Sequence, residues 1–179
     1  MDESLHGHCV VAINKTTVLV IGGENDNGIS NKTHVYNFDF DKWYIGPELL
    51  KERSFHACGV FQNSTNWMIA VIGGENDQGE VLDSVEFAVL DEDNTQTMTW
   101  EWKYGPQFPF KLTDSTAVSS NSKLYFVGGT AKEDSRLNTI YELADNLTWI
   151  ELPQKMSVAR SLVAAIILPE DLNNDLRKS

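Results

Sequence analysis

A nine-residue motif occurs twice in this chain of 179 residues, and a shortened copy occurs a third time. Residues 20–28 read VIGGENDNG, residues 71–79 read VIGGENDQG, and residues 126–129 read FVGG. The first glycines of the three pairs, Gly22, Gly73 and Gly128, are 51 and 55 residues apart (73 − 22 and 128 − 73). Self-similarity at such a period indicates repeated supersecondary units that stack on one another.

Further landmarks follow each glycine pair in the same order. An aromatic residue comes first, then a tryptophan, and then a proline four residues after the tryptophan. The three sets are Tyr36, Trp43 and Pro47; Phe87, Trp102 and Pro106; and Tyr141, Trp149 and Pro153. Several landmarks that recur in one order make a chance match improbable, so the sequence predicts three homologous units.

Each unit is predicted to contain four short strands. The first strands are expected at 9–13, 56–61 and 115–119, and the second at 18–21, 68–72 and 124–127, where nearly unbroken apolar runs favour burial on both faces. The third strand surrounds the aromatic residue, where the first two units alternate between apolar and polar residues. The tryptophan opens the fourth strand, which should end at the proline because proline cannot continue the ladder.

Two segments need separate interpretation. The polar insertion at 91–99 is predicted to be a loop. Residues 155–168 are rich in Ala, Leu and Met and could form a helix on their own, but they follow Pro153 where the first strand of a next unit belongs. We therefore predict a lone strand at 158–168, which contains the apolar run at 163–168.

With Gly-Gly closing the second strand, an aromatic residue on the third and tryptophan opening the fourth, the unit resembles the kelch repeat. The resemblance covers residues 5–168, and it departs from the kelch pattern where the usual Asp after the aromatic residue is Asn37, Ala88 or Glu142. In kelch proteins each repeat is one blade of a β-propeller. The resemblance implies an all-β fold of three four-stranded antiparallel blades.

A propeller closes with about four to eight blades, so the chain resembles the C-terminal part of a larger one. The predicted organisation is three repeats at about 5–52, 53–112 and 113–153, a closing strand at 158–168 and a polar tail at 169–179. Blades without neighbours expose apolar surface, and self-association would cover it. The tryptophan of each repeat is expected to be buried, so Trp43→Ala is expected to unfold the domain.

Charge and hydropathy exclude several functions. The chain holds 26 acidic and 14 basic residues, a net charge of −12, which disfavours binding to nucleic acid or to anionic lipid. Its longest apolar runs, of five or six residues, are too short to span a bilayer. The N-terminus has no signal-peptide pattern, so the chain as it stands suggests the cytoplasm, and secretion would require upstream sequence.

The resemblance also implies where a partner would bind. Kelch propellers contact partners through the loops after Gly-Gly and through the inter-blade loops, which share one face. Residues that match these contact positions are Glu24, Asn25, Arg53, Ser54, Glu75, Asn76, Ser115, Lys132, Arg160 and Ser161. We expect a protein or peptide partner with separated charges, although Glu-Asn-Asp-x-Gly is also ordinary turn chemistry.

The resemblance leaves the kind of kelch protein open. A substrate-recruiting propeller of a ubiquitin-ligase adaptor, and a secreted or cytoskeletal (actin-binding) kelch protein, both fit it. A sugar-active enzyme of the mutarotase or oxidase type is the alternative from another class, and Arg53 and Arg160 with Glu24 or Glu75 resemble its channel groups weakly. The copper ligands of a galactose-oxidase-like centre have no counterpart here, so we expect no catalysis and no cofactor.

The sequence also bears on metal sites, on a disulfide and on glycosylation. The acidic turns offer too few oxygens for calcium, and the His and Cys residues near the N-terminus match no zinc-finger spacing, so no metal is expected. Cys9 and Cys58 lie on first strands of neighbouring repeats, where they are either small core residues or a disulfide. Four N-x-Thr sequons begin at Asn14, Asn31, Asn63 and Asn146, against about two by chance (14 × 25/179).

Overall fold

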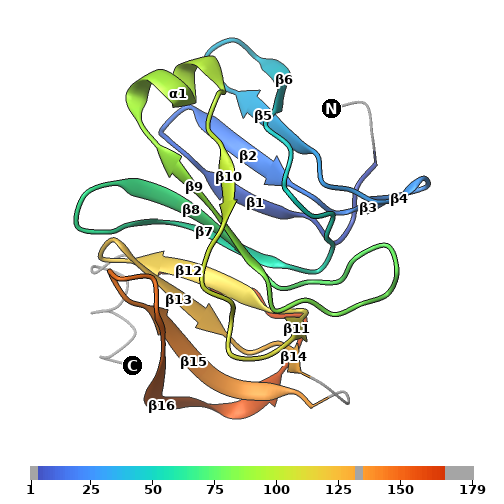
Figure 1. The fold of residues 1–179 in the computed structure, drawn as a ribbon, viewed down its shortest axis with the longest axis vertical. Helices are drawn as coiled ribbons and strands as arrows, with labels where there is room; N and C mark the ends of the chain where they lie inside the picture. Colours follow the sequence, from blue (N-terminus) through green and yellow to red (C-terminus); the bar gives the residue numbers. More distant parts are fainter. Residues whose placement is uncertain (1–3, 132–134, 168–179) are drawn as a thin grey trace, which may run out of the picture.

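Three antiparallel sheets of four strands make up most of the computed structural model, which describes residues 4–131 and 135–167 (Figure 1). The first sheet contains β1 (Cys9–Ala12), β2 (Thr17–Ile21), β5 (Thr33–Asn37) and β6 (Lys42–Gly46). The second contains β7 (Ala57–Gln62), β8 (Trp67–Ile72), β9 (Val85–Leu90) and β10 (Trp102–Tyr104). The third contains β12 (Thr116–Ser120), β13 (Lys123–Val127), β15 (Leu137–Leu143) and β16 (Trp149–Arg160). The prediction of three four-stranded antiparallel blades is confirmed.

Two short ribbons lie beyond the glycine pairs. β3 (Glu24–Asn25) pairs with β4 (Gly28–Ile29), and β11 (Leu112–Thr113) pairs with β14 (Thr130–Ala131). The second ribbon joins the segment before the third sheet to the loop after its glycine pair. Both ribbons lie at the same side of the molecule, on the right in Figure 1.

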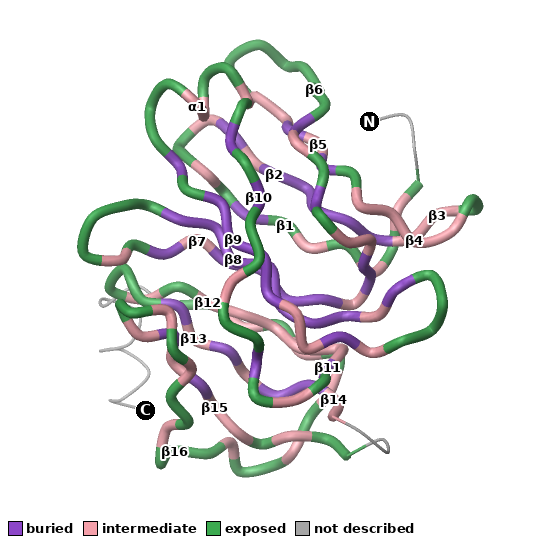
Figure 2. Tube along the Cα trace, viewed as in Figure 1, coloured by how far each residue is buried: buried purple, intermediate pink, exposed green. Residues whose placement is uncertain are grey.

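The second sheet is packed on both faces. Ile69 and Val71 of β8 belong to the apolar cluster shared with the first sheet, while Ala70 and Ile72 belong to the cluster shared with the third. All four side chains are fully buried. Figure 2 shows the same contrast along the chain, with β8 mostly buried and β16 largely exposed. The unbroken apolar run in β8 therefore reflects its place between two neighbours.

The tryptophan landmark marks one structural position, and the aromatic landmark does not. The residue before each glycine pair has a partner on the third strand: Thr33, Val85 and Ile140. Three residues further along the third strand come Tyr36, Ala88 and Leu143, and these are the partners of Trp43, Trp102 and Trp149. Phe87 and Tyr141 come one and two residues before that position. The predicted equivalence of the three aromatic residues is therefore wrong in register.

The ends of the fourth strands follow the prolines in two repeats out of three. β6 ends at Gly46, before Pro47, and β10 ends at Tyr104. β16 instead continues through Pro153 to Arg160, with irregular register against β15. An outermost strand tolerates proline because one side of its backbone has no ladder partner.

The predicted closing strand does not form as a separate element. Residues 158–160 belong to β16, residues 161–167 lie in no strand, and Leu168 and the tail at 169–179 fall outside the described residues. Even so, the Leu162 N–H donates to the Asp114 carbonyl at 2.8 Å. The same type of bond joins the earlier repeats, where the Asp114 N–H donates to the Phe55 carbonyl and the Phe55 N–H donates to the Gly7 carbonyl. Leu162 thus occupies the first position of a next repeat, but a strand also requires a ladder partner.

The insertion at 91–99 contains a short helix, α1 (Glu92–Thr97), so the prediction of a loop there is wrong. Asp91 caps it: its carboxylate accepts the Asn94 N–H at 2.7 Å, and the Asn94 side chain accepts the Asp91 N–H at 3.0 Å. This reciprocal capping box satisfies two amide groups that a helix start leaves unpaired. Residues 92–97 are polar throughout and so lack the apolar periodicity from which a helix is predicted. Among the described residues no helix is long or apolar enough to cross a membrane.

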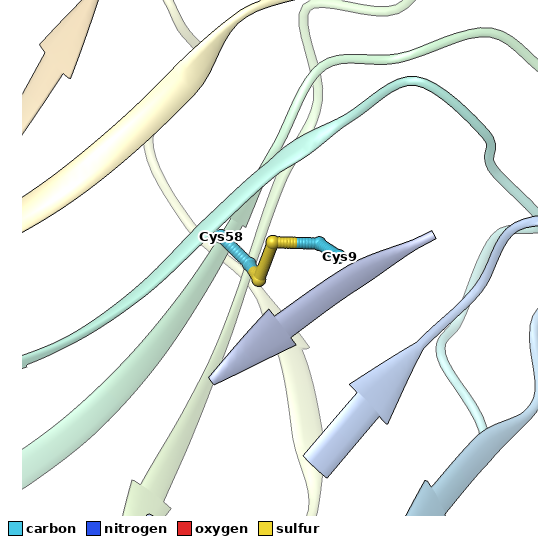
Figure 3. Close-up of a disulfide and its surroundings, with 2 residues drawn as sticks. All are labelled: Cys9 and Cys58. Atoms are coloured by element: carbon cyan, nitrogen blue, oxygen red, sulfur yellow. A yellow bond between two sulfur atoms is a disulfide. The ribbon is translucent and has the colours of Figure 1, made fainter. Parts of the chain in front are cut away.

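Cys9 and Cys58 form a disulfide with a Cα–Cα distance of 6.0 Å, which decides between the two sequence readings. The bond joins β1 of the first sheet to β7 of the second (Figure 3). Neighbouring blades are therefore linked covalently at their innermost strands.

The outer faces of the first and third sheets are open. On the first, Val10, Trp43 and Ile45 are 50%, 41% and 77% exposed, so the expectation that Trp43 is buried is wrong. Along the third, an open groove of about 910 Å³ is lined by Val127, Val158 and other residues of the 156–164 segment. Both faces are apolar surfaces of the kind that a neighbouring blade covers.

Candidate partner-binding face

The glycine pair ends each second strand with the same turn. The N–H groups of Gly23, Gly74 and Gly129 donate at 2.8–2.9 Å to the carbonyls of Arg53, Leu112 and Arg160, which lead into the next repeat. The preceding glycines have φ between 56° and 64°, and a Cβ there would lie within 3 Å of those same carbonyl oxygens. Only glycine fits this close approach. The turn therefore brings the loop after Gly-Gly against the inter-blade loop.

The loops of the first two blades touch directly. The Asp77 carboxylate, from the loop of the second blade, accepts the N–H of Ile29 in β4 at 3.0 Å. Ser54 and Glu75 exchange backbone hydrogen bonds at 3.0 and 2.9 Å, which joins the inter-blade loop to the same group. These contacts form one continuous edge, which we call the loop face; it carries the two ribbons on the right of Figure 1.

Carboxylates gather on the loop face. Glu24 is half-buried and pairs with His6, whose Nε2 lies 3.2 Å from a carboxylate oxygen of Glu24. Burial raises the pKa of Glu75, and the nearby negative charges of Asp114 and Glu24 raise it further. Burial also raises the pKa of Asp114. The negative charges of Glu24 and Asp114, from the neighbouring blades, therefore act on Glu75.

Three of the predicted contact residues are buried, so their expected place on the surface is wrong. Arg53 and Ser54 have no exposed area, and Asn76 is 1% exposed. The Asn76 carboxamide oxygen accepts the N–H groups of Gln78 and Glu80 at 3.1 and 2.9 Å, so this residue shapes its own turn. Ser54 holds Glu75 through its backbone.

Arg53 belongs to a buried network beneath the loop face. Its guanidinium lies 2.7 Å from the carboxylate of Glu86, which is also fully buried, and donates to the carbonyls of Gly73 and Ser84 at 2.7 and 3.3 Å. The same carboxylate accepts the N–H groups of Leu50 and Lys51 at 2.7 and 3.1 Å. The network ties the loop after the first blade to β9 of the second. Arg53 therefore has no exposed area, and its guanidinium is held by this network.

The remaining predicted residues lie as follows. Asn25, Ser115 and Ser161 are half-buried, Arg160 is exposed, and Lys132 is outside the described residues. Arg160 holds the repeat position of Arg53, since each carbonyl accepts the N–H of the second glycine of the preceding pair. It is exposed because no sheet follows it in the described part of the chain.

Sequence reasoning missed Asp114 and His6. Asp114 repeats the position of Gly7 and Phe55, and all three have φ between 53° and 62°. The Phe55 N–H donates to the Gly7 carbonyl, and the Asp114 N–H donates to the Phe55 carbonyl, so the three positions are linked from repeat to repeat. Gly7, Phe55 and Asp114 lie 15, 18 and 14 residues before the glycine pairs (22 − 7, 73 − 55 and 128 − 114), so the spacing in the sequence did not show that they are equivalent. Within residues 4–131 and 135–167, no group of three or more His, Cys, Asp or Glu side chains is placed to hold a metal ion.

A buried histidine beside this face makes stability depend on pH. Burial, then the positive charge of Arg53, then His8, lowers the pKa of His56 to about 3. The folded state therefore binds fewer protons than the unfolded chain, whose histidine titrates near 6.5. The contribution of neutral, buried His56 to the free energy of unfolding is complete above about pH 6.5 and is lost as the pH falls toward 3.

We expect the free energy of unfolding to fall by about 2–3 kcal/mol between pH 7 and pH 4.5 because of His56. His56→Gln should flatten this slope in urea titrations, whereas His6→Gln, which changes a largely exposed histidine, should keep it. Carboxylates contribute to the pH dependence of the wild type and of both variants, so the difference between the slopes reports on the histidine. An unchanged slope in His56→Gln would refute the assignment.

Known proteins resemble the chain in both sequence and fold. It is 27% identical over 164 residues to Kelch-like protein 41b of Danio rerio, covering 87% of this chain and 25% of that protein. It is 30% identical over 158 residues to host cell factor 1 of Homo sapiens, covering 82% of this chain and 7% of that protein. The solved structure of YjhT superposes with a TM-score of 0.70 at 16% identity, covering 90% of this chain and 59% of YjhT.

The chain thus spans a quarter or less of these two curated relatives. The model of the KLHDC2/KLHL20/DRC7 Kelch-repeats domain matches residues 7–168. With three four-stranded sheets built on the same Gly-Gly turn, the chain belongs to the kelch-repeat family.

Proposed function

We propose that this chain is a non-catalytic protein-interaction module that binds a protein or peptide through the loop face. Its membership of the kelch-repeat family supports an interaction role. We choose the loop face because its successive loops are hydrogen-bonded to one another, Asp77 to Ile29 and Ser54 to Glu75. These bonds offer a partner one rigid surface. A pre-organised surface lowers the entropic cost of binding.

The charges on this face suggest the chemistry of the partner. Glu24 and Glu75 place negative charge over the first two blades; burial raises the pKa of Glu75, and the nearby charges of Asp114 and Glu24 raise it further. Exposed Arg136 and Arg160 lie towards the other end, on the third blade. A peptide with a basic segment over the first two blades and an acidic segment towards the third is complementary to this distribution.

The test uses peptides selected from a random display library on the wild-type chain. Association rates are measured by surface plasmon resonance at several salt concentrations. Changing both Glu24 and Glu75 to Lys should slow association about tenfold at low salt and flatten its salt dependence. The melting temperature should change little, because both side chains are half-exposed.

A matched control carries the same change of charge elsewhere. Glu92 and Glu101 are exposed near α1, at the opposite edge, and their double change to Lys should leave the association rate nearly unaltered. If the Glu24/Glu75 variant bound at the wild-type rate at low salt, the acidic part of the face would not be the binding surface.

A further inference from the structure

Three of the four sequons lie in hairpin turns at one edge of the molecule. Asn14 lies between β1 and β2, Asn63 between β7 and β8, and Asn146 between β15 and β16. In a four-stranded antiparallel blade the first and third turns share one edge, and the second turn and the inter-blade loop share the other. These three asparagines are therefore at the edge opposite to the loop face; the hairpin turns that contain them lie on the left side of Figure 1.

The three turns have the same local structure. The side-chain oxygens of Asn14, Asn63 and Asn146 accept the backbone N–H of the Thr two residues later at 2.9, 3.0 and 3.2 Å. Each also accepts the hydroxyl of that Thr, at 3.4, 3.2 and 2.7 Å. Asn14 and Asn146 are exposed and Asn63 is half-buried. Asn14 and Asn146 thus present the amide nitrogen and the Thr hydroxyl of the sequon together on a surface hairpin. The half-buried Asn63 has the same turn, and its Nδ2 also donates to Met68 Sδ at 3.4 Å.

Asn31 differs from the other three. It lies just before β5, towards the loop face, and its Nδ2 donates to the Leu49 carbonyl at 3.1 Å. It is half-buried, and its Thr33 is fully buried with a hydroxyl that donates to Pro47. Unlike at the other three sequons, both the acceptor nitrogen and the buried Thr hydroxyl of this sequon donate to carbonyls of the loop that follows the first blade.

The disulfide is independent evidence for the compartment. Cys9 and Cys58, the only cysteines of the chain, are joined across the interface of the first two blades (Figure 3). Disulfides persist in secreted proteins and in the endoplasmic reticulum, and are rare in the cytosol. N-x-Thr sequons are acceptors of glycans in that same secretory route.

We propose that Asn14, Asn63 and Asn146 carry N-linked glycans and that this propeller works in an oxidising, glycan-transferring compartment. In each transfer the Asn Nδ2 loses a proton and forms a bond to the anomeric carbon of a lipid-pyrophosphate oligosaccharide, whose pyrophosphate lipid leaves. In the formation of the disulfide, the two thiols lose two electrons and two protons to an exchanging disulfide, which becomes a dithiol. The glycans cover the hairpin edge and leave the loop face free.

The first experiment uses the protein from its source tissue and the same chain directed to the secretory route of cultured cells. Peptide N-glycosidase F should convert Asn14, Asn63 and Asn146 to Asp, read by mass spectrometry, and should leave Asn31 unchanged. Thr16→Ala, Thr65→Ala and Thr148→Ala should each remove one glycan from the intact mass, while Asn31→Gln should remove none. Source protein without glycans at the three sites, or with a glycan at Asn31 instead, would overturn the proposal.

The second experiment tests the disulfide on the same source protein. Alkylation before reduction should label neither cysteine, and alkylation after reduction should label both. Reduction should also lower the melting temperature, because the bond closes a long loop between Cys9 and Cys58. Free thiols in freshly isolated source protein would show that the chain works in a reducing compartment and would overturn the proposal without touching the loop face.

Discussion

Changing Arg53 to Met is expected to lower the free energy of unfolding by about 3–5 kcal/mol. The guanidinium is fully buried and is the cation that faces Glu86, whose carboxylate is also without exposed area. Without Arg53, that negative charge would stay in the interior with only two backbone N–H groups to solvate it. Denaturation in urea, followed by circular dichroism, measures the loss.

Two further variants show that the charge is responsible. Adding Glu86→Gln to Arg53→Met removes the buried charge and keeps an acceptor for the Leu50 and Lys51 amides, so part of the stability should return. Arg160→Met changes the arginine that holds the same position two repeats later, which is exposed, and should cost at most about 1 kcal/mol. Equal losses at Arg53 and Arg160 would contradict the buried network.

The repeat made the architecture predictable. The antiparallel blades and the strand that carries each Trp follow from the order of landmarks repeated after Gly22, Gly73 and Gly128, because each repeat solves the same packing problem. The alternation of β8 between two neighbouring sheets follows from the same reasoning.

Apart from helix α1, which a local capping box starts, the failures have one physical origin, which is dependence on partners distant in the sequence. Arg53 resembles an exposed loop arginine until Glu86, 33 residues away, is brought to it. The segment at 161–167 has the apolar pattern of a strand, but a strand forms only against a ladder partner, and the described chain supplies none. The disulfide likewise required the distance between β1 and β7, which sequence spacing leaves open.

The candidate site was predictable in its location and not in its members. The loops after Gly-Gly do lie at one edge, yet turn residues with the same letters take different roles. Asn25 is half-exposed while Asn76, its counterpart in the second repeat, is buried. The second loop lies between two other blades, and the first has a neighbour on one side only, so their burial differs.

The same asymmetry predicts different outcomes for two tryptophans at one repeat position. Trp102 is 5% exposed, packs against the first sheet and donates from Nε1 to the Pro47 carbonyl at 3.0 Å. Trp102→Ala should therefore cost about 3–5 kcal/mol of unfolding free energy. Trp43 faces the side where a preceding blade would lie and is 41% exposed, so Trp43→Ala should cost about 1 kcal/mol or less.

The comparison also reports on what covers the first sheet in solution. Both variants remove the same side chain from the same register position, so the difference in unfolding free energy measures the contribution of the neighbouring blade. If Trp43→Ala were as damaging as Trp102→Ala, then the outer face of the first sheet would be covered, by a second copy or by another part of a longer protein. Light scattering at the concentration of the unfolding experiment separates these two, because only a second copy doubles the mass.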